Sequence, residues 1–211
     1  MKIHRTFISV FILSIVLLSI AGAQVGRGRF GFGVSAGPAL LQSDLKTNDV
    51  GYGASADLSY SLGHGWGLMS SLGYDAYTGK DNTNQTIYSN VFRGDLALTF
   101  DFLRSKPFNP FVFAGGGVMF AYPRNVNGIA LVSVKSQLWD SYAVGGLGID
   151  YFINESWSVI VTAGGAYTST DLMDGKLGGG KNDTFARGSI GVRYYLFDRS
   201  TVEKIVEAVQ K

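Results

Sequence analysis

The stretch Tyr52-Gly-Ala-Ser-Ala-Asp-Leu-Ser-Tyr-Ser-Leu62 alternates apolar residues with small or polar ones. Its even-numbered positions hold Tyr, Ala or Leu, and its odd-numbered positions hold Gly, Ser or Asp. Successive side chains of a β-strand point to opposite faces of the sheet. The stretch therefore predicts a strand with one apolar face and one polar face.

The same alternation recurs along most of the chain and predicts about eight strands. In one of these runs Phe92 and Leu96 share the apolar face, while Arg93 and Asp95 share the polar one. The run 110–122 carries large apolar residues on both parities, so its orientation stays open. We expect the strands at roughly 30–40, 52–62, 66–77, 88–102, 110–122, 138–152, 157–170 and 184–197.

The connections between these runs alternate in length. Those at 63–65, 104–109 and 153–156 are short, whereas those at 41–51, 79–87, 124–137 and 171–183 are longer and polar. Short turns at one rim and long loops at the other are typical of bacterial outer-membrane barrels, whose apolar face contacts lipid. We therefore predict an all-β protein, a transmembrane up-and-down antiparallel β-barrel over residues 24–197, with the long loops outside the cell.

Both ends of the chain depart from this pattern. Residues 1–23 resemble a signal peptide, with a basic start, an apolar run over 7–20 and the cleavage site Ala21-Gly22-Ala23. A membrane anchor helix is the weaker alternative, because the run is shorter than the ~20 residues that span a bilayer. Residues 198–211 predict a short amphipathic helix in the periplasm, which begins with the capping pair Ser200 and Glu203. This tail is a docking element, a plug at the rim of the barrel or a frayed end.

Composition argues against several classes of function. The chain has 18 Lys and Arg against 16 Asp and Glu, and loss of Lys2 and Arg5 with the signal peptide leaves 16 against 16. This balance gives no reason to expect a nucleic-acid partner. The chain has no Cys and therefore no thiolate metal site. We expect no cofactor, no metal and no enzymatic activity, because the single His of the mature chain, His64, falls in a short turn at the periplasmic rim.

Charged residues on the polar parity are the candidate functional site. A charge inside a narrow lumen must be paired, because desolvation costs several kcal/mol per ion. We expect Arg93 and Arg187 each to find a carboxylate and to close the lumen. The alternative is a gated polar pore whose pairs exchange partners when it opens. The candidates are Asp57, Asp75, Arg93, Asp95, Asp101, Asp150, Arg187 and Arg193.

Aromatic residues cluster where the strands are expected to meet the two membrane surfaces. Amphipathic rings prefer the headgroup level of a bilayer. The alternative is that these rings form the core of a soluble barrel, because alternation alone does not show which face is inside. The main membrane-interface candidates are Tyr60, Trp66, Trp139, Tyr151, Trp157 and Tyr194, and the same two belts also include Tyr52, Tyr74, Tyr88, Phe100, Phe102, Phe111 and Tyr167.

Three segments carry a family resemblance: Asn109-Pro-Phe-Val-Phe-Ala-Gly-Gly-Gly117, Gly146-Leu-Gly-Ile-Asp-Tyr151 and Gly191-Val-Arg-Tyr-Tyr-Leu196. Together with the signal peptide and the eight runs, they resemble the small OmpA/OmpX-type outer-membrane β-barrels, which include the opacity-type adhesins. The resemblance implies the fold and an outer-membrane location, and no particular activity. We expect no peptidoglycan-binding domain and therefore no wall-tethering role of the longer family members. A tail follows Phe197, where the family usually ends on an aromatic residue.

The best interpretation is a monomeric, integral envelope protein of a Gram-negative-type bacterium. Its expected partners are outer-membrane lipid and the outer-membrane insertion machinery, and no extracellular partner can be named. An eight-stranded interior is wide enough only for its own side chains or one small ligand. This width disfavours an open pore. The alternatives are a narrow channel for ions or small solutes, a surface adhesin that acts through the long loops and a soluble lipocalin-like carrier.

Overall fold

A computed structural model of the chain describes residues 30–43, 45–81, 83–103, 107–131, 139–154, 156–169, 173 and 182–196. The expected signal peptide, 1–23, and the expected tail helix, 198–211, lie outside these residues. Across the described ranges, no helix has the length and apolar character needed to cross a membrane.

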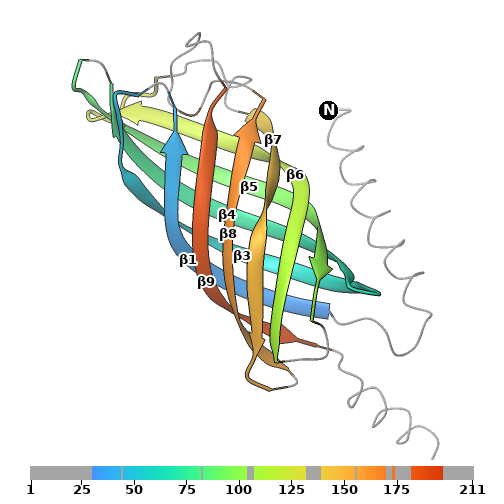
Figure 1. Ribbon diagram of the computed structural model, residues 1–211. Coiled ribbons are helices and arrows are strands. Elements are labelled where there is room, and N and C mark those ends of the chain that lie inside the picture. The colour runs from blue at the N-terminus through green and yellow to red at the C-terminus, as the bar shows by residue number, and fades with distance from the viewer. Residues whose placement is uncertain are drawn as a thin grey trace, which may run out of the picture.

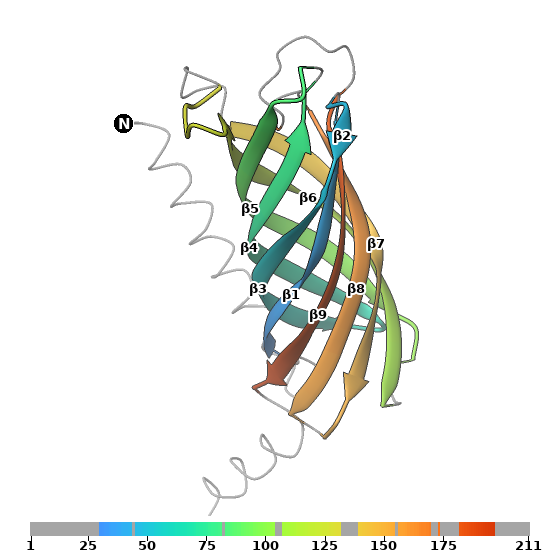
Figure 2. The same ribbon diagram turned by 90° about the vertical axis from the view of Figure 1, so that its left-hand side faces the viewer.

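The described chain forms a closed antiparallel β-barrel of eight long strands and one short strand (Figures 1 and 2). Neighbouring long strands pair in the order β4-β3-β1-β9-β8-β7-β6-β5, and the pairing of β4 with β5 closes the barrel. The predicted all-β barrel is thus confirmed. The strands are β1 (Phe30–Gln42), β2 (Thr47–Asn48), β3 (Val50–Gly63), β4 (Trp66–Lys80), β5 (Thr86–Asp101), β6 (Phe108–Asn125), β7 (Trp139–Phe152), β8 (Trp157–Thr168) and β9 (Thr184–Tyr195).

One end of the barrel, here called the short-turn end, carries the connections β3–β4, β5–β6 and β7–β8. The tightest is His64-Gly65, where φ is 52° and 92°. A two-residue hairpin with positive φ at both central residues matches the twist of its strands, and glycine adopts this conformation without a steric penalty. The short turn predicted at 63–65 is confirmed.

The other end, here called the long-connection end, contains more strand than the sequence predicted. The range 79–87 was expected to be a long loop, but β4 continues to Lys80 and β5 begins at Thr86. The side chain of Asp81 closes this hairpin by accepting hydrogen bonds from the backbone N–H groups of Thr83 and Gln85, both at 2.8 Å. The expected loop 41–51 likewise contains β2, which pairs with β4. Polar composition alone did not distinguish extended strands from loops here.

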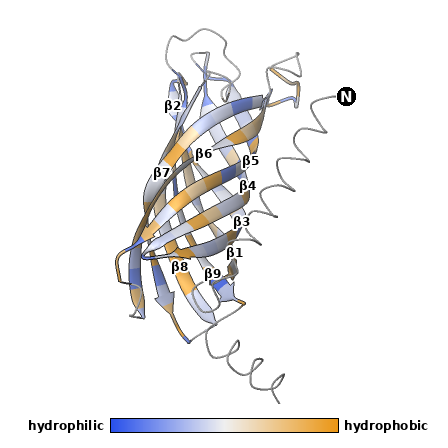
Figure 3. Cartoon of the chain, turned by 90° about the vertical axis from the view of Figure 1, so that its right-hand side faces the viewer, coloured by the Kyte–Doolittle hydropathy of each residue, from blue (hydrophilic) through white to orange (hydrophobic). Residues whose placement is uncertain are grey.

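The two faces of the strands differ as the alternation predicted. Leu72 and Leu96 point out of the barrel and are 71% and 58% exposed, whereas Asp75 points into the lumen and is fully buried. Apolar and polar residues recur along each strand (Figure 3), and the exposed large apolar residues lie on the outward parity. In β6, whose orientation the sequence left open, Val112 faces outward and Phe111 faces inward with 4% exposure. The placement of Phe111 in an outer aromatic belt was therefore wrong.

Candidate functional site in the barrel lumen

A buried ion network lies near the short-turn end of the lumen. Arg193 on β9 donates from Nε and Nη2 to Asp57 Oδ2 on β3, at 3.0 and 2.7 Å. Its Nη1 donates to Asp150 Oδ2 on β7 at 3.2 Å, and the Tyr195 hydroxyl donates to the same carboxylate. We call these four residues the short-turn ion layer. It ties β9 to two strands that are not its neighbours in the barrel.

A glycine on the intervening strand allows Arg193 to reach Asp57. Gly33 of β1 pairs with Asp57 on one side and with Arg193 on the other. A Cβ atom at Gly33 would lie 2.6 Å from Asp57 Oδ1. The absence of a side chain at this position therefore leaves room for the ion pair to form across β1.

A second ion network lies closer to the long-connection end. Arg93 on β5 donates from Nε to Asp75 Oδ2 at 2.9 Å and from Nη1 to Asp95 Oδ2 at 2.5 Å. Arg187 on β9 places its Nε 2.9 Å from the other oxygen of Asp75. The Tyr142 hydroxyl donates to Asp95 at 3.0 Å. We call Asp75, Arg93, Asp95, Tyr142 and Arg187 the long-connection ion layer.

An apolar cluster fills the lumen beyond this layer, toward the long-connection end. Tyr77, Val91 and Met119 are buried in it, together with Phe185. Met173, from the connection after β8, is also fully buried there, and its backbone N–H donates to Asp183 Oδ2 at 2.8 Å. The alternation predicts an inward face of mostly small or polar residues. The large apolar residues on the inward parity at 77, 91 and 185 were the signal for this cluster.

A cavity of about 80 Å³ separates the two ion layers. The hydroxyls of Ser35 and Ser55 bond to each other at 3.0 Å on one part of its wall, and those of Thr162 and Ser189 bond at 2.7 Å on another. Arg187 also lines it. The cavity is large enough and polar enough to hold water, which needs room for about one probe sphere and polar partners.

The structure brings most of the predicted charged residues together, in two groups. Asp75, Arg93, Asp95 and Arg187 form one group, and Asp57, Asp150 and Arg193 form the other. Asp101 lies apart from Asp95, at the short-turn end of β5, where it is half buried. Sequence reasoning missed Tyr142 and Tyr195. Tyr195 stands two residues after Arg193 on the same parity, which could have indicated its place in the network.

Comparison with known proteins supports the architecture. Neither a protein-family model nor a curated protein matches the chain. Among solved structures, Ail of Yersinia pestis, in complex with the heparin analogue sucrose octasulfate, matches with a TM-score of 0.53 and 13% identity, over 81% of this chain and 99% of Ail. Neisserial surface protein A matches with a TM-score of 0.52 and 18% identity, over 78% and 96% of the two chains. The chain has the fold of the small outer-membrane β-barrels. OprG of Pseudomonas aeruginosa matches with a TM-score of 0.52 and 15% identity, over 82% and 99%.

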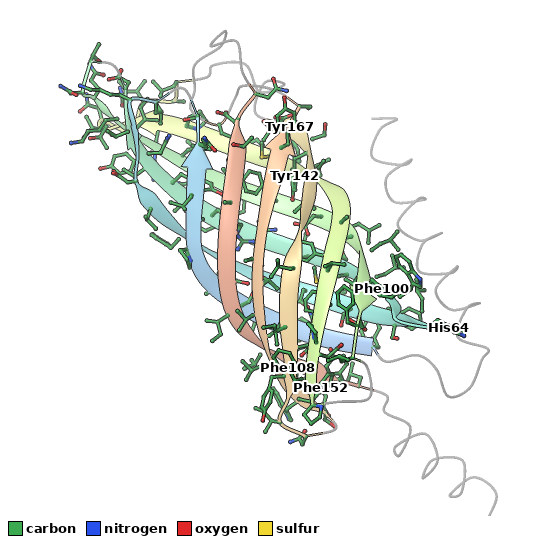
Figure 4. All side chains as sticks on the ribbon, viewed as in Figure 1. His64, Phe100, Phe108, Tyr142, Phe152 and Tyr167 are labelled. Atoms are coloured by element: carbon green, nitrogen blue, oxygen red, sulfur yellow. The ribbon has the colours of Figure 1, made fainter. Side chains whose placement is uncertain are left out.

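The candidate interface aromatics of this barrel lie on its outer surface at both ends. Trp66 packs edge-on against Phe100 with ring centroids 5.1 Å apart, and Trp157 contacts Tyr194 at 4.9 Å. Trp139, at the opposite end, is 60% exposed. Tyr60 and Tyr151 also point outward. Figure 4 shows His64, Phe108 and Phe152 at the short-turn end and Tyr167 at the other.

Proposed function

We propose that the protein is an integral outer-membrane barrel with a closed lumen and a structural role in the cell envelope. The outward apolar face supports the membrane location. Leu72, Leu96 and Ile190 each expose more than half of their surface. Large contiguous apolar surfaces are rare on soluble monomers and are stable against lipid. Lipid and the insertion machinery are its proposed partners, and a monomer is its proposed state.

The closed lumen is supported mainly by the two ion layers and the apolar cluster, which lie one after another along it. A solute that enters from the short-turn end meets Arg193 with its two carboxylates. Beyond the cavity it meets Arg93, Asp75 and Arg187, and then the apolar cluster. Each ion layer crosses the lumen between strands that are not neighbours. This arrangement favours a structural barrel over a narrow channel.

Fractionation and vesicle swelling test this proposal. The protein should be recovered in the outer-membrane fraction and should resist extraction at high pH. Vesicles that contain it should swell in a small sugar no faster than empty vesicles. Recovery in the soluble periplasm would contradict the membrane location, whereas fast swelling would contradict only the closed lumen.

A second candidate function, surface attachment, is favoured by the hairpin that follows β6. Val126 and Ile129 are more than 60% exposed at its tip. The turn is held by Asn125, whose side chain accepts hydrogen bonds from the N–H groups of Asn127 and Ile129 at 3.0 and 2.9 Å. An ordered turn that presents apolar side chains suits binding of a partner. The double substitution Val126→Ser and Ile129→Ser should then reduce attachment of whole cells without changing the amount of barrel in the membrane.

A further inference from the structure

Arg187 is poorly paired for a largely buried cation. Its Nε lies 2.9 Å from Asp75 Oδ1, but the two atoms are not aligned for a hydrogen bond. Neither of these atoms nor Arg187 Nη2 has a hydrogen-bond partner among the described residues. Asp75 also accepts a hydrogen bond from Arg93 at its other oxygen, so two arginines share one carboxylate. Buried polar groups are normally satisfied by protein or by bound groups, and Arg187 has donors to spare.

The cavity between the two ion layers offers room for a ligand beside Arg187, which lines it. Further donors stand on the cavity wall. Ser35 and Ser55 form one hydroxyl pair, and Thr162 and Ser189 form another. In each pair one hydroxyl donates to the other, so the accepting hydroxyl keeps its own proton for a further acceptor. The wall therefore presents a cation and two hydroxyl donors to one small volume.

The carboxylates that line the cavity are already engaged by other arginines. Asp95 accepts a hydrogen bond from Arg93 at 2.5 Å, and Asp57 accepts two from Arg193, at 3.0 and 2.7 Å. The two ion layers contain one carboxylate more than arginines, and Asp150, which shares Arg193 with Asp57, is not among the residues that line the cavity. The cavity is therefore suited to an anion on its Arg187 side.

We propose that the lumen cavity binds one small monovalent anion, held by the guanidinium group of Arg187 and by the free hydroxyls of the two pairs. A hydrogen bond between an arginine and an anion is roughly twice as strong as one between neutral groups. The cavity volume of about 80 Å³ limits the ligand to a few non-hydrogen atoms, because a cavity of about 150 Å³ is needed for benzene. Chloride fits these limits. The anion completes the pairing of Arg187 and thereby stabilises the folded barrel.

Thermal unfolding in detergent micelles tests the anion site, because a ligand that binds only the folded state raises its stability. Chloride is varied at constant ionic strength by exchange with gluconate, which is too large for the cavity. We expect the unfolding midpoint to rise with chloride concentration. Above the dissociation constant, each tenfold increase in chloride should raise the ratio of folded to unfolded protein about tenfold. Equal midpoints in the two salts would overturn the anion site.

Three variants separate binding in the cavity from general effects of the two salts. Arg187→Gln should abolish the chloride dependence, whereas Arg124→Gln, the matched control on the outer face of β6, should keep it. If Arg187→Gln does not fold, Val144→Phe decides, because it fills the cavity without removing a charge or a hydroxyl. A chloride dependence that persists in Arg187→Gln or in Val144→Phe would contradict the proposal.

Diffraction from crystals grown in bromide locates the ligand, because bromide scatters X-rays anomalously. We expect one anomalous peak in the cavity, within hydrogen-bond distance of the Arg187 guanidinium group. Ordered water alone in the cavity would refute the anion site. A bromide peak without any chloride dependence in solution would mean an adventitious ion only and would refute it as well. Neither experiment depends on the membrane location or on the closed lumen, which fractionation and vesicle swelling test separately.

Discussion

Asp75 and Arg187 lie 2.9 Å apart although β3 and β1 separate their strands in the barrel. The guanidinium group reaches Asp75 across Gly53 of β3, where a Cβ atom would lie 3.1 Å from Arg187 Nη2. Asp75 also binds Arg93 through its other oxygen. One buried carboxylate therefore links β4, β5 and β9, and its two partners extend across the lumen at this level.

Removing one member of the Arg93–Asp95 ion pair should lower the stability of the barrel more than removing both members. Arg93→Ala leaves the buried carboxylates of Asp75 and Asp95 with one cation fewer, so it should lower the free energy of unfolding by about 3–5 kcal/mol. Asp95→Asn in the same chain should restore part of that loss, because it removes the excess charge. Urea unfolding in detergent micelles measures both. If the stability loss of the double variant equalled the sum of the losses of the two single variants, the ion pair would be contradicted.

The glycine beneath Arg93 should not tolerate a side chain. A Cβ atom at Gly73 would lie 2.6 Å from Arg93 Nη2, which is buried. Gly73→Ala should destabilise the barrel by about 1–3 kcal/mol, as overpacking does. The matched control is Gly165→Ala, where the nearest atom would be 3.7 Å away. Equal thermal stability of the two variants would argue against the close approach of Arg93.

A charged side chain on the apolar outer face should destabilise the folded barrel. Leu96 is 58% exposed and lies near the middle of β5. Leu96→Arg should destabilise the folded barrel by roughly 2–4 kcal/mol if the residue lies near the bilayer midplane. Leu96→Phe, the control, should fold like the parent. The measurement is unfolding in lipid vesicles, and a loss that appears equally in detergent and in lipid would point to packing instead.

The long-connection end should face the outside of the cell. Lys46 and Lys80 are exposed there, so trypsin added to intact cells should cleave near them. Arg104, in the connection between β5 and β6, should be spared until the outer membrane is permeabilised. Mass spectrometry of the fragments identifies the sites. Cleavage at Arg104 alone would invert the topology.

The alternation of residues predicts the eight long strands and, outside β6, the faces of those strands, because side-chain direction depends only on position along a strand. It could not predict which arginine meets which aspartate. That depends on the stagger of the strands around the barrel, which brings Asp75 level with Arg187 although the two lie far apart in sequence.

The orientation of β6 and the apolar cluster were also not predicted from the sequence, each for a local reason. In β6, Phe111 and Val112 are both large and apolar, so parity could not show which one faces lipid. The apolar cluster around Tyr77 and Met119 uses positions that elsewhere hold small or polar residues. The two-residue period identifies only which parity faces inward, so the cluster is indicated only by the size of single residues on that parity, such as Tyr77 and Phe185.

Single-channel recording tests the closed lumen most directly. The purified protein is inserted in a planar bilayer, and its conductance is recorded in concentrated KCl over a range of voltages. Because two ion layers and an apolar cluster lie in series along the lumen, we predict no steady conductance above that of the bare bilayer. A large, steady conductance of the unmodified protein would contradict the closed lumen and establish a channel.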